Sequence, residues 1–197
     1  MRIIDVLFFL IFIIISGCRN NVSLNEPPTS NDTITSQKEI WPLALGNTWT
    51  YDVFIYDSTG NVRQSASGSI SVVRESVINN SKWYQISTSD WWFANRDSGL
   101  YLRIDTDTCL YFKYPGNVKD SSYVIPYGSY STIFSTDTSI TTKSGKYSCY
   151  AYNVNRGFFT RYFSVGVGII KEEQYLLTNS GRRYMYISMS LSSVSLK

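Results

Sequence analysis

The stretch TWTYDVFIYD, residues 48–57, decides the fold class because large side chains recur in it with a period of two. The alternating set consists of Trp49, Tyr51, Val53 and Ile55. Side chains two residues apart share one face of an extended strand, so these four side chains form one apolar face. Phe54 and Tyr56 make the other face partly apolar as well. The stretch therefore predicts a strand that is covered on both sides.

The chain that follows repeats this pattern between short turns. Tyr, Trp, Phe, Val, Ile and Thr dominate its strand-like runs, and no long stretch shows the 3.6-residue period of an amphipathic helix. DSTGN at 57–61 and INNSK at 78–82 contain the residue types that form tight turns. The spacing of such turns predicts nine or ten strands.

Short turns between so many strands indicate an all-β fold, an antiparallel meander. A meander must hide its two edges, so we expect it to curl into a barrel or half-barrel, with a β-sandwich as the alternative. We expect few or no helices in this region. Residues 116–138 read as irregular, with one helical turn near Ser129–Phe134.

Residues 1–17 have the layout of a secretory signal peptide. A basic residue at Arg2 precedes an apolar run of about ten residues, and small residues follow that run. The run is shorter than the roughly 20 residues that a membrane-spanning helix needs. Ile15-Ser16-Gly17-Cys18 resembles the bacterial lipobox, which implies that Cys18 is acylated through its sulfur and becomes the new N-terminus.

Composition and length predict how the chain after the signal peptide is organised. Residues 18–39 comprise the lipidated Cys18 and a tether rich in Asn, Ser, Thr and Pro, and residues 40–197 form a single β domain. A flexible coil of this length spans on the order of 25 Å. Arg19 follows the cysteine where sorting systems read Asp as an inner-membrane signal, which implies the outer membrane, on its periplasmic or cell-surface side.

WPLALGNTWTY, residues 41–51, resembles the opening of a group of uncharacterised Gram-negative envelope lipoproteins. Further pieces fit the same group: YFKYPGNV at 111–118, DTSITTKSGKYSCYAY at 137–152 and FSVGVGIIKEE at 163–173. The resemblance implies an envelope location and brings no activity, cofactor or site residue with it. From the residues themselves, we expect Trp49 to anchor the core, and Gly166 and Gly168 to mark a bulge or a close strand crossing.

The sequence assigns no catalytic residue, metal ligand or cofactor. Histidine is absent, which excludes Ser-His-Asp and Cys-His catalysis. The carboxylates considered for glycoside hydrolysis favour no particular pair: Asp52, Asp57, Asp105, Asp107 and Glu172. Glu172 and Glu173 are adjacent, so they should face opposite ways on a strand, and we interpret them as surface charge. A net charge of +3 does not indicate a nucleic-acid partner.

Four further residues are candidates for special roles. Cys109 and Cys149 remain once Cys18 is assigned to lipid, and they form either a disulfide or two separate buried thiols. Trp91 and Trp92 lie in DWWFANRD, the densest aromatic patch, where one of them could stack on a sugar ring. Core packing or contact with a partner explains the same tryptophans equally well.

Together these features predict a membrane-anchored envelope lipoprotein that is not an enzyme. Its β domain would act as a structural or protein-interaction module. The alternative is a binding module for a lipid or glycan ligand. The membrane is reached through the N-terminal lipid, and the candidate partners are envelope proteins, a glycan or a lipid.

Overall fold

A computed structural model describes residues 39–197 of the protein, which form one compact unit. The predicted signal peptide, the predicted lipidation site Cys18 and the chain up to Lys38 lie outside these residues. No helical segment between residues 39 and 197 has the length and apolar character needed to cross a bilayer.

The described residues form twelve strands, two or three more than the turn spacing predicts. The strands are β1 (Thr48–Tyr56), β2 (Val62–Ile78), β3 (Ser81–Ile86), β4 (Trp92–Arg96), β5 (Gly99–Ile104), β6 (Asp107–Lys113), β7 (Ser121–Val124), β8 (Ser129–Thr142), β9 (Gly145–Val154), β10 (Phe159–Ser164), β11 (Gly168–Leu177) and β12 (Arg183–Ser195). Two short 3₁₀ turns accompany them, η1 (Ile125–Tyr127) and η2 (Asn155–Gly157). The prediction of an all-β fold with few helices is confirmed.

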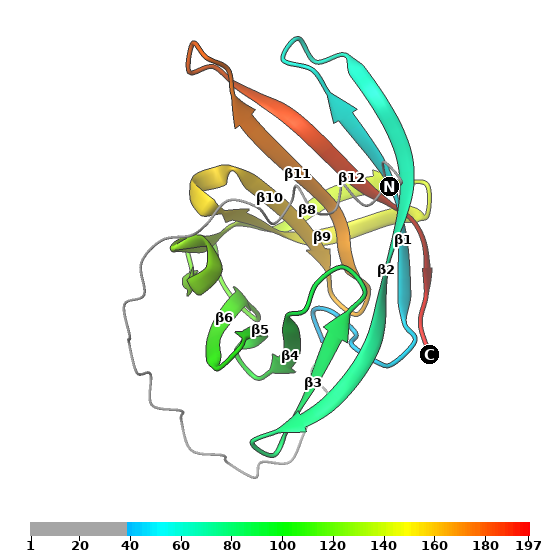
Figure 1. Ribbon diagram of the computed structural model, residues 1–197, viewed down its shortest axis with the longest axis vertical. Coiled ribbons are helices and arrows are strands. Elements are labelled where there is room, and N and C mark those ends of the chain that lie inside the picture. The colour runs from blue at the N-terminus through cyan, green and yellow to red at the C-terminus, as the bar shows by residue number, and fades with distance from the viewer. Residues whose placement is uncertain (1–38) are drawn as a thin grey trace. The chain divides into compact units, whose positions relative to one another are not determined.

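All twelve strands belong to one antiparallel sheet with the order β6-β5-β4-β3-β2-β1-β12-β11-β10-β9-β8-β7. Every neighbour is consecutive in sequence except β1 and β12, which pair from Thr48↔Ser195 to Ile55↔Ile187. The sheet curls into a nearly closed barrel (Figure 1). Its ends are β6 and β7, and across them the Ser122 hydroxyl donates to the Tyr111 carbonyl oxygen at 3.2 Å. The curled meander is therefore confirmed over the sandwich.

The face of β1 predicted to be apolar points into the barrel. Trp49 and Tyr51 are at most 1% exposed, and the Trp49 indole donates to the Val167 carbonyl oxygen at 2.6 Å. Trp41, just before β1, packs against rings from three strands: Trp49 at 5.5 Å, Phe93 at 5.5 Å and Phe163 at 6.2 Å between centroids. Buried rings of this size dominate the energetics of a core, so Trp41 joins strands from both halves of the sheet.

Gly168 is the close approach that its sequence context predicts. A Cβ atom added at Gly168 would lie 2.4 Å from Cδ1 of Trp41. The backbone φ of Gly168 is +105°, which residues with a side chain rarely adopt. Only glycine meets both conditions without strain. Gly168 therefore lets β11 pass directly against the Trp41 ring.

The segment 116–138 differs from its sequence-based prediction. The helical turn is η1 at Ile125–Tyr127, with Pro126 inside it and Gly128 ending it in a left-handed conformation, whereas Ser129–Phe134 is strand. β8 continues to Thr142, and its turn into β9 reaches elements that are not its neighbours in the sheet. Lys143 forms an ion pair with Asp52 of β1 at 2.8 Å, and the Ser144 hydroxyl donates to the Leu191 carbonyl oxygen of β12 at 3.2 Å. The β8–β9 hairpin thus crosses β11 and β12 (Figure 1).

Candidate functional site

A charged pair, Arg161 and Glu172, lies inside the barrel. Arg161 on β10 is the cross-strand partner of Glu172 on β11, so both side chains project from the same face of the sheet. The Arg161 Nε–H donates to Glu172 Oε2, and the two side chains are 14% and 6% exposed. Taking two charges out of water is costly unless the geometry and further hydrogen bonds compensate.

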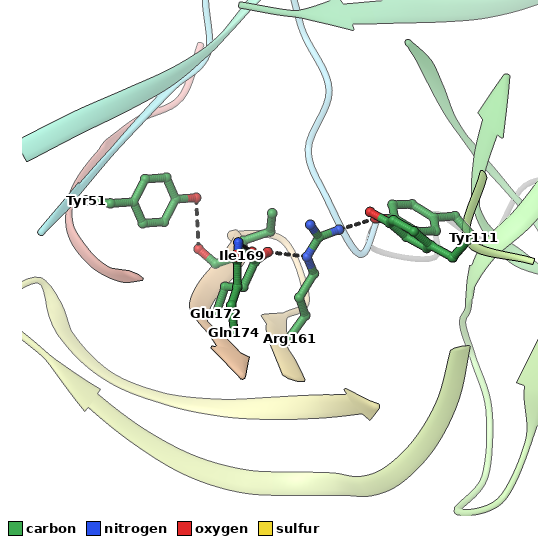
Figure 2. Close-up of polar contacts among 7 residues, drawn as sticks. Tyr51, Tyr111, Arg161, Ile169, Glu172 and Gln174 are labelled. Atoms are coloured by element: carbon green, nitrogen blue, oxygen red, sulfur yellow. Dashed lines mark hydrogen bonds and ion pairs between the residues drawn. The ribbon is translucent and has the colours of Figure 1, made fainter. Parts of the chain in front are cut away.

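Further hydrogen bonds hold both members of this pair. The Gln174 amide donates to Glu172 Oε1 at 2.8 Å, and Arg161 Nη1 donates to the Tyr111 hydroxyl. Figure 2 shows Arg161 between the carboxylate and this tyrosine. The guanidinium carbon also lies 5.5 Å from the centre of the Tyr111 ring, within cation–π range. We call these four residues, Arg161, Glu172, Gln174 and Tyr111, the buried network.

The electrostatics of the network favour a permanently charged arginine beside neutral tyrosines. Burial is the largest effect on Arg161 and opposes its charge, but the Glu172 carboxylate together with Tyr111 and Tyr127 outweighs burial and raises the pKa of the guanidinium well above its usual value. Burial raises the pKa of the Tyr111 hydroxyl well above its usual value, although Arg161 acts in the opposite direction. Burial, followed by the charge of Glu172, raises the pKa of Tyr51 in the same way. Neither tyrosine is set up to act as a base near neutral pH.

The network reaches the barrel rim through Tyr127. The Tyr111 and Tyr127 hydroxyls lie 3.3 Å apart, and Tyr127 is half-buried. Its ring stacks on Phe159 at 5.6 Å and meets the edge of Trp91 at 6.4 Å. Trp91, Tyr127 and Phe159 form what we call the aromatic rim.

The structure places the two candidate tryptophans in different surroundings. Trp91 precedes β4 and belongs to the aromatic rim, whereas Trp92 begins β4 and pairs with Gln85 and Arg103 of the adjacent strands. Both are half-buried. They therefore do not form a joint platform, and stacking on a ligand stays a prediction for each.

Cys109 and Cys149 are free, buried thiols, and no disulfide joins them in the structure. Cys109 lies on β6 and Cys149 on β9, which are not neighbours in the sheet. Burial raises the pKa of both thiols, and that of Cys149 reaches about 12. A thiol held protonated in this way is a poor nucleophile.

Apart from Glu172, the carboxylates considered for glycoside hydrolysis lie in separate places. Asp52 pairs with Lys143, Asp57 accepts bonds within its own turn, and Asp105 and Asp107 are exposed around the β5–β6 turn. Between residues 39 and 197, no group of three acidic or cysteine side chains is close enough to hold a metal ion.

The interpretation of Glu172 and Glu173 as surface charge was wrong. They do face opposite ways, but Glu172 is 5% exposed. The Glu173 side chain, 13% exposed, binds Lys171 Nζ at 2.6 Å and the Tyr175 hydroxyl at 2.8 Å. One sequence signal could have identified the inward site: Arg161 stands two residues from both Phe159 and Phe163, on the phase that faces the core.

No protein-family model matches the chain, and no curated protein matches it. Two solved structures are among those to which the chain is similar. One is a protein of Parabacteroides distasonis provisionally described as a lipoprotein, at 15% identity and a TM-score of 0.43, covering 80% of this chain and 99% of that one. The other is a protein of Bacteroides fragilis with a YmcC-like fold, provisionally described as exported. It is 12% identical with a TM-score of 0.47, and the match covers 81% of this chain and 100% of that one. Likenesses this distant assign no function.

Proposed function

We propose that the protein is an envelope lipoprotein, held at the outer membrane by lipid on Cys18, and that its β domain is a non-catalytic protein-interaction module. The anchor rests on the apolar run that ends in Ile15-Ser16-Gly17-Cys18. The module rests on one observation of the structure, which is how the barrel interior is filled.

Large side chains occupy the interior of the described barrel. Trp49, Phe112 and Phe163 have no exposed surface, and Tyr152 is 1% exposed. The interior charges bind each other in the buried network rather than pointing into open space. Interiors packed in this way resist insertion of a further group. Recognition is therefore assigned to the outer surface of the barrel.

An exposed aromatic surface on β7, η1 and β8 suits that role. Tyr123 and Tyr130 are cross-strand partners with 51% and 58% of their surface exposed, and their rings meet edge to face at 5.4 Å. Ile125, 39% exposed, follows in η1. Tyrosine is enriched at protein interfaces because it supplies contact area together with a polar tip. We call Tyr123, Ile125 and Tyr130 the tyrosine face.

Site-specific crosslinking in cells tests this assignment. A photoreactive residue at the exposed Ser121, beside the tyrosine face, should form an adduct with an envelope protein, whereas the same residue at the exposed Lys82 on β3 should not. The pair Tyr123→Ser and Tyr130→Ser should abolish the adduct. The proposal fails if Ser121 yields no protein adduct, or if the adduct survives the double substitution.

A glycan-binding module is the second candidate, and the aromatic rim favours it. Trp91, Tyr127 and Phe159 bring three rings together at the barrel surface, and Tyr127 and Phe159 are half-buried. Titration of the protein with a panel of envelope glycans measures this role directly. Binding that Phe159→Ala removes and Trp92→Ala leaves intact would support the glycan module over the protein-interaction module.

A further inference from the structure

Three turns meet at the end of the barrel where β1 finishes: residues 57–61, residues 155–158 and residues 178–182. Two arginines connect them. Arg182 Nη2 donates to the Ser58 carbonyl oxygen at 2.7 Å, and Arg183 Nη2 donates to the Gly157 carbonyl oxygen. We call these three turns, together with Arg63, Arg156, Arg182 and Arg183, the arginine end.

The arginine end is strongly basic. All four arginines are exposed, and none of the ion pairs within residues 39–197 includes them. Asp57 is the acid in the three turns, and its Oδ1 accepts from the Thr59 hydroxyl, the Thr59 amide and the Asn61 amide. The arginine end therefore has four positive charges and one carboxylate, and that carboxylate already accepts hydrogen bonds from its own turn. Such an excess attracts anionic partners.

Exposed apolar side chains lie among these charges. Leu176 and Leu177 at the end of β11 are 42% and 53% exposed, and Val62 at the start of β2 is 54% exposed. Successive residues of a strand point to opposite faces, so exposure of both leucines means that the β11–β12 hairpin projects into solvent. Figure 1 shows the β1–β2 and β11–β12 hairpins extending beyond the rest of the sheet.

We propose that the arginine end docks the β domain onto an anionic lipid bilayer. Arginines bind lipid phosphates through bidentate hydrogen bonds, and leucines on a projecting hairpin enter the boundary between headgroups and acyl chains. The projecting shape favours a bilayer over an acidic protein as the partner. A hairpin tip that inserts into lipid buries both of its apolar faces, whereas a flat contact with a protein surface buries only one of them.

The lipid anchor leaves room for this orientation. The described chain begins at the opposite end of β11, where the Glu39 carbonyl oxygen accepts from the Gly166 amide at 2.7 Å. β11 has 10 residues, which spans about 33 Å. The chain from Cys18 to Glu39 can reach at most about 70 Å, so the arginine end can meet the same membrane that holds the anchor. This step rests on the proposed lipidation of Cys18.

Hydrogen exchange of the lipidated full-length protein in vesicles tests the docking. Vesicles of phosphatidylcholine containing phosphatidylglycerol should slow exchange in the three turns, relative to phosphatidylcholine alone. Raising the ionic strength from about 0.1 M to about 1 M should reverse the effect, because the Debye length falls from about 10 Å to about 3 Å. The double variant Arg63→Glu and Arg156→Asp should weaken docking at least 25-fold, about fivefold for each arginine.

Two variants control the interpretation. Arg74→Glu with Lys146→Glu makes a similar charge change at exposed positions outside the arginine end and should leave the protection intact. Leu176→Ser with Leu177→Ser keeps the charges and should weaken docking. Equal exchange in both kinds of vesicle, or the same protection by soluble polyglutamate without lipid, overturns the proposal. Retention of the protein in vesicles after a high-salt wash reports the anchor separately from the docking.

Discussion

At the scale of single residues, the central feature is the buried Arg161–Glu172 pair. Both charges are removed from water, and each depends on the other for compensation. Breaking a buried pair leaves one charge unpaired in the interior, which costs far more than the loss of a surface ion pair. Glutamine has nearly the same shape as glutamate and no charge, so Glu172→Gln tests the effect of the charge alone.

Glu172→Gln should lower the free energy of unfolding by about 3–5 kcal/mol, because it leaves the Arg161 guanidinium buried without a counter-charge. Lys143→Ala breaks the exposed pair with Asp52 and should cost at most about 1 kcal/mol. Urea unfolding of the two variants measures both values. Equal losses would show that the buried network does not stabilise the fold as described.

Alkaline pH should also destabilise the protein through its buried tyrosines. The pKa values of Tyr51 and Tyr111 are raised in the folded state, so the unfolded chain releases these protons near pH 10 while the folded chain keeps them. Their stabilisation is complete below about pH 10 and is lost as the pH rises through the folded-state pKa values. Urea unfolding at increasing pH should show this fall, and Tyr111→Phe should make it shallower. A stability that stays constant above pH 10 would contradict it.

The site was harder to predict from sequence than the fold. Arg161 and Glu172 look like ordinary charged residues of exposed strands until their register is known. That register depends on a bulge between Tyr162 and Phe163, where one strand gains a residue over its partner. A bulge shifts the phase of the face pointing inward, and a single sequence does not reveal its position. The Phe159 and Phe163 flanks were the available signal.

At the scale of elements, alternating residues predicted β1 correctly and composition concealed β8. In β1 a large apolar or aromatic side chain recurs at every second position, whereas β8 runs through Ser and Thr with few large side chains. A Ser- and Thr-rich composition is typical of loops, so the sequence of β8 does not indicate a strand. Pro126 and Gly128, on the other hand, are ordinary turn signals, and they do mark η1.

The crossing of β11 over Trp41 makes the sharpest prediction for an element. Gly168→Ala should destabilise the protein by about 1–3 kcal/mol more than Gly60→Ala, because the added methyl group overlaps the Trp41 ring. Gly60 is a matched control: its φ is also positive, at +92°, and nothing lies within 4 Å of its added Cβ. Thermal unfolding compares the two. Equal shifts would mean that backbone conformation, and not the close approach, requires glycine at position 168.

At the scale of the whole molecule, the barrel closes by pairing the first strand with the last. β1 and β12 come from opposite ends of the described chain, and no local sequence pattern in either strand predicts that they pair. The sequence predicted that the meander must curl, since an open sheet leaves two unpaired edges. It did not predict where the remaining opening lies, which is between β6 and β7.

The same scale separates the three proposed surfaces. The tyrosine face lies on β7, η1 and β8, the aromatic rim includes Tyr127 of η1, and the arginine end lies at η2 and at the tips of the β1–β2 and β11–β12 hairpins. A domain held to a membrane by a lipid can use one surface on the bilayer and another on a protein. The docking of the arginine end rests on the proposed lipidation of Cys18.

Metabolic labelling with a palmitate analogue tests the anchor most directly. The full-length protein should become labelled and fractionate with the outer membrane, and Cys18→Ala should abolish the label because it removes the sulfur that carries the lipid. Cys109→Ala and Cys149→Ala should keep the label, since both thiols lie buried in the β domain. Labelling that persists in Cys18→Ala would contradict the assignment of this protein as an envelope lipoprotein anchored through Cys18.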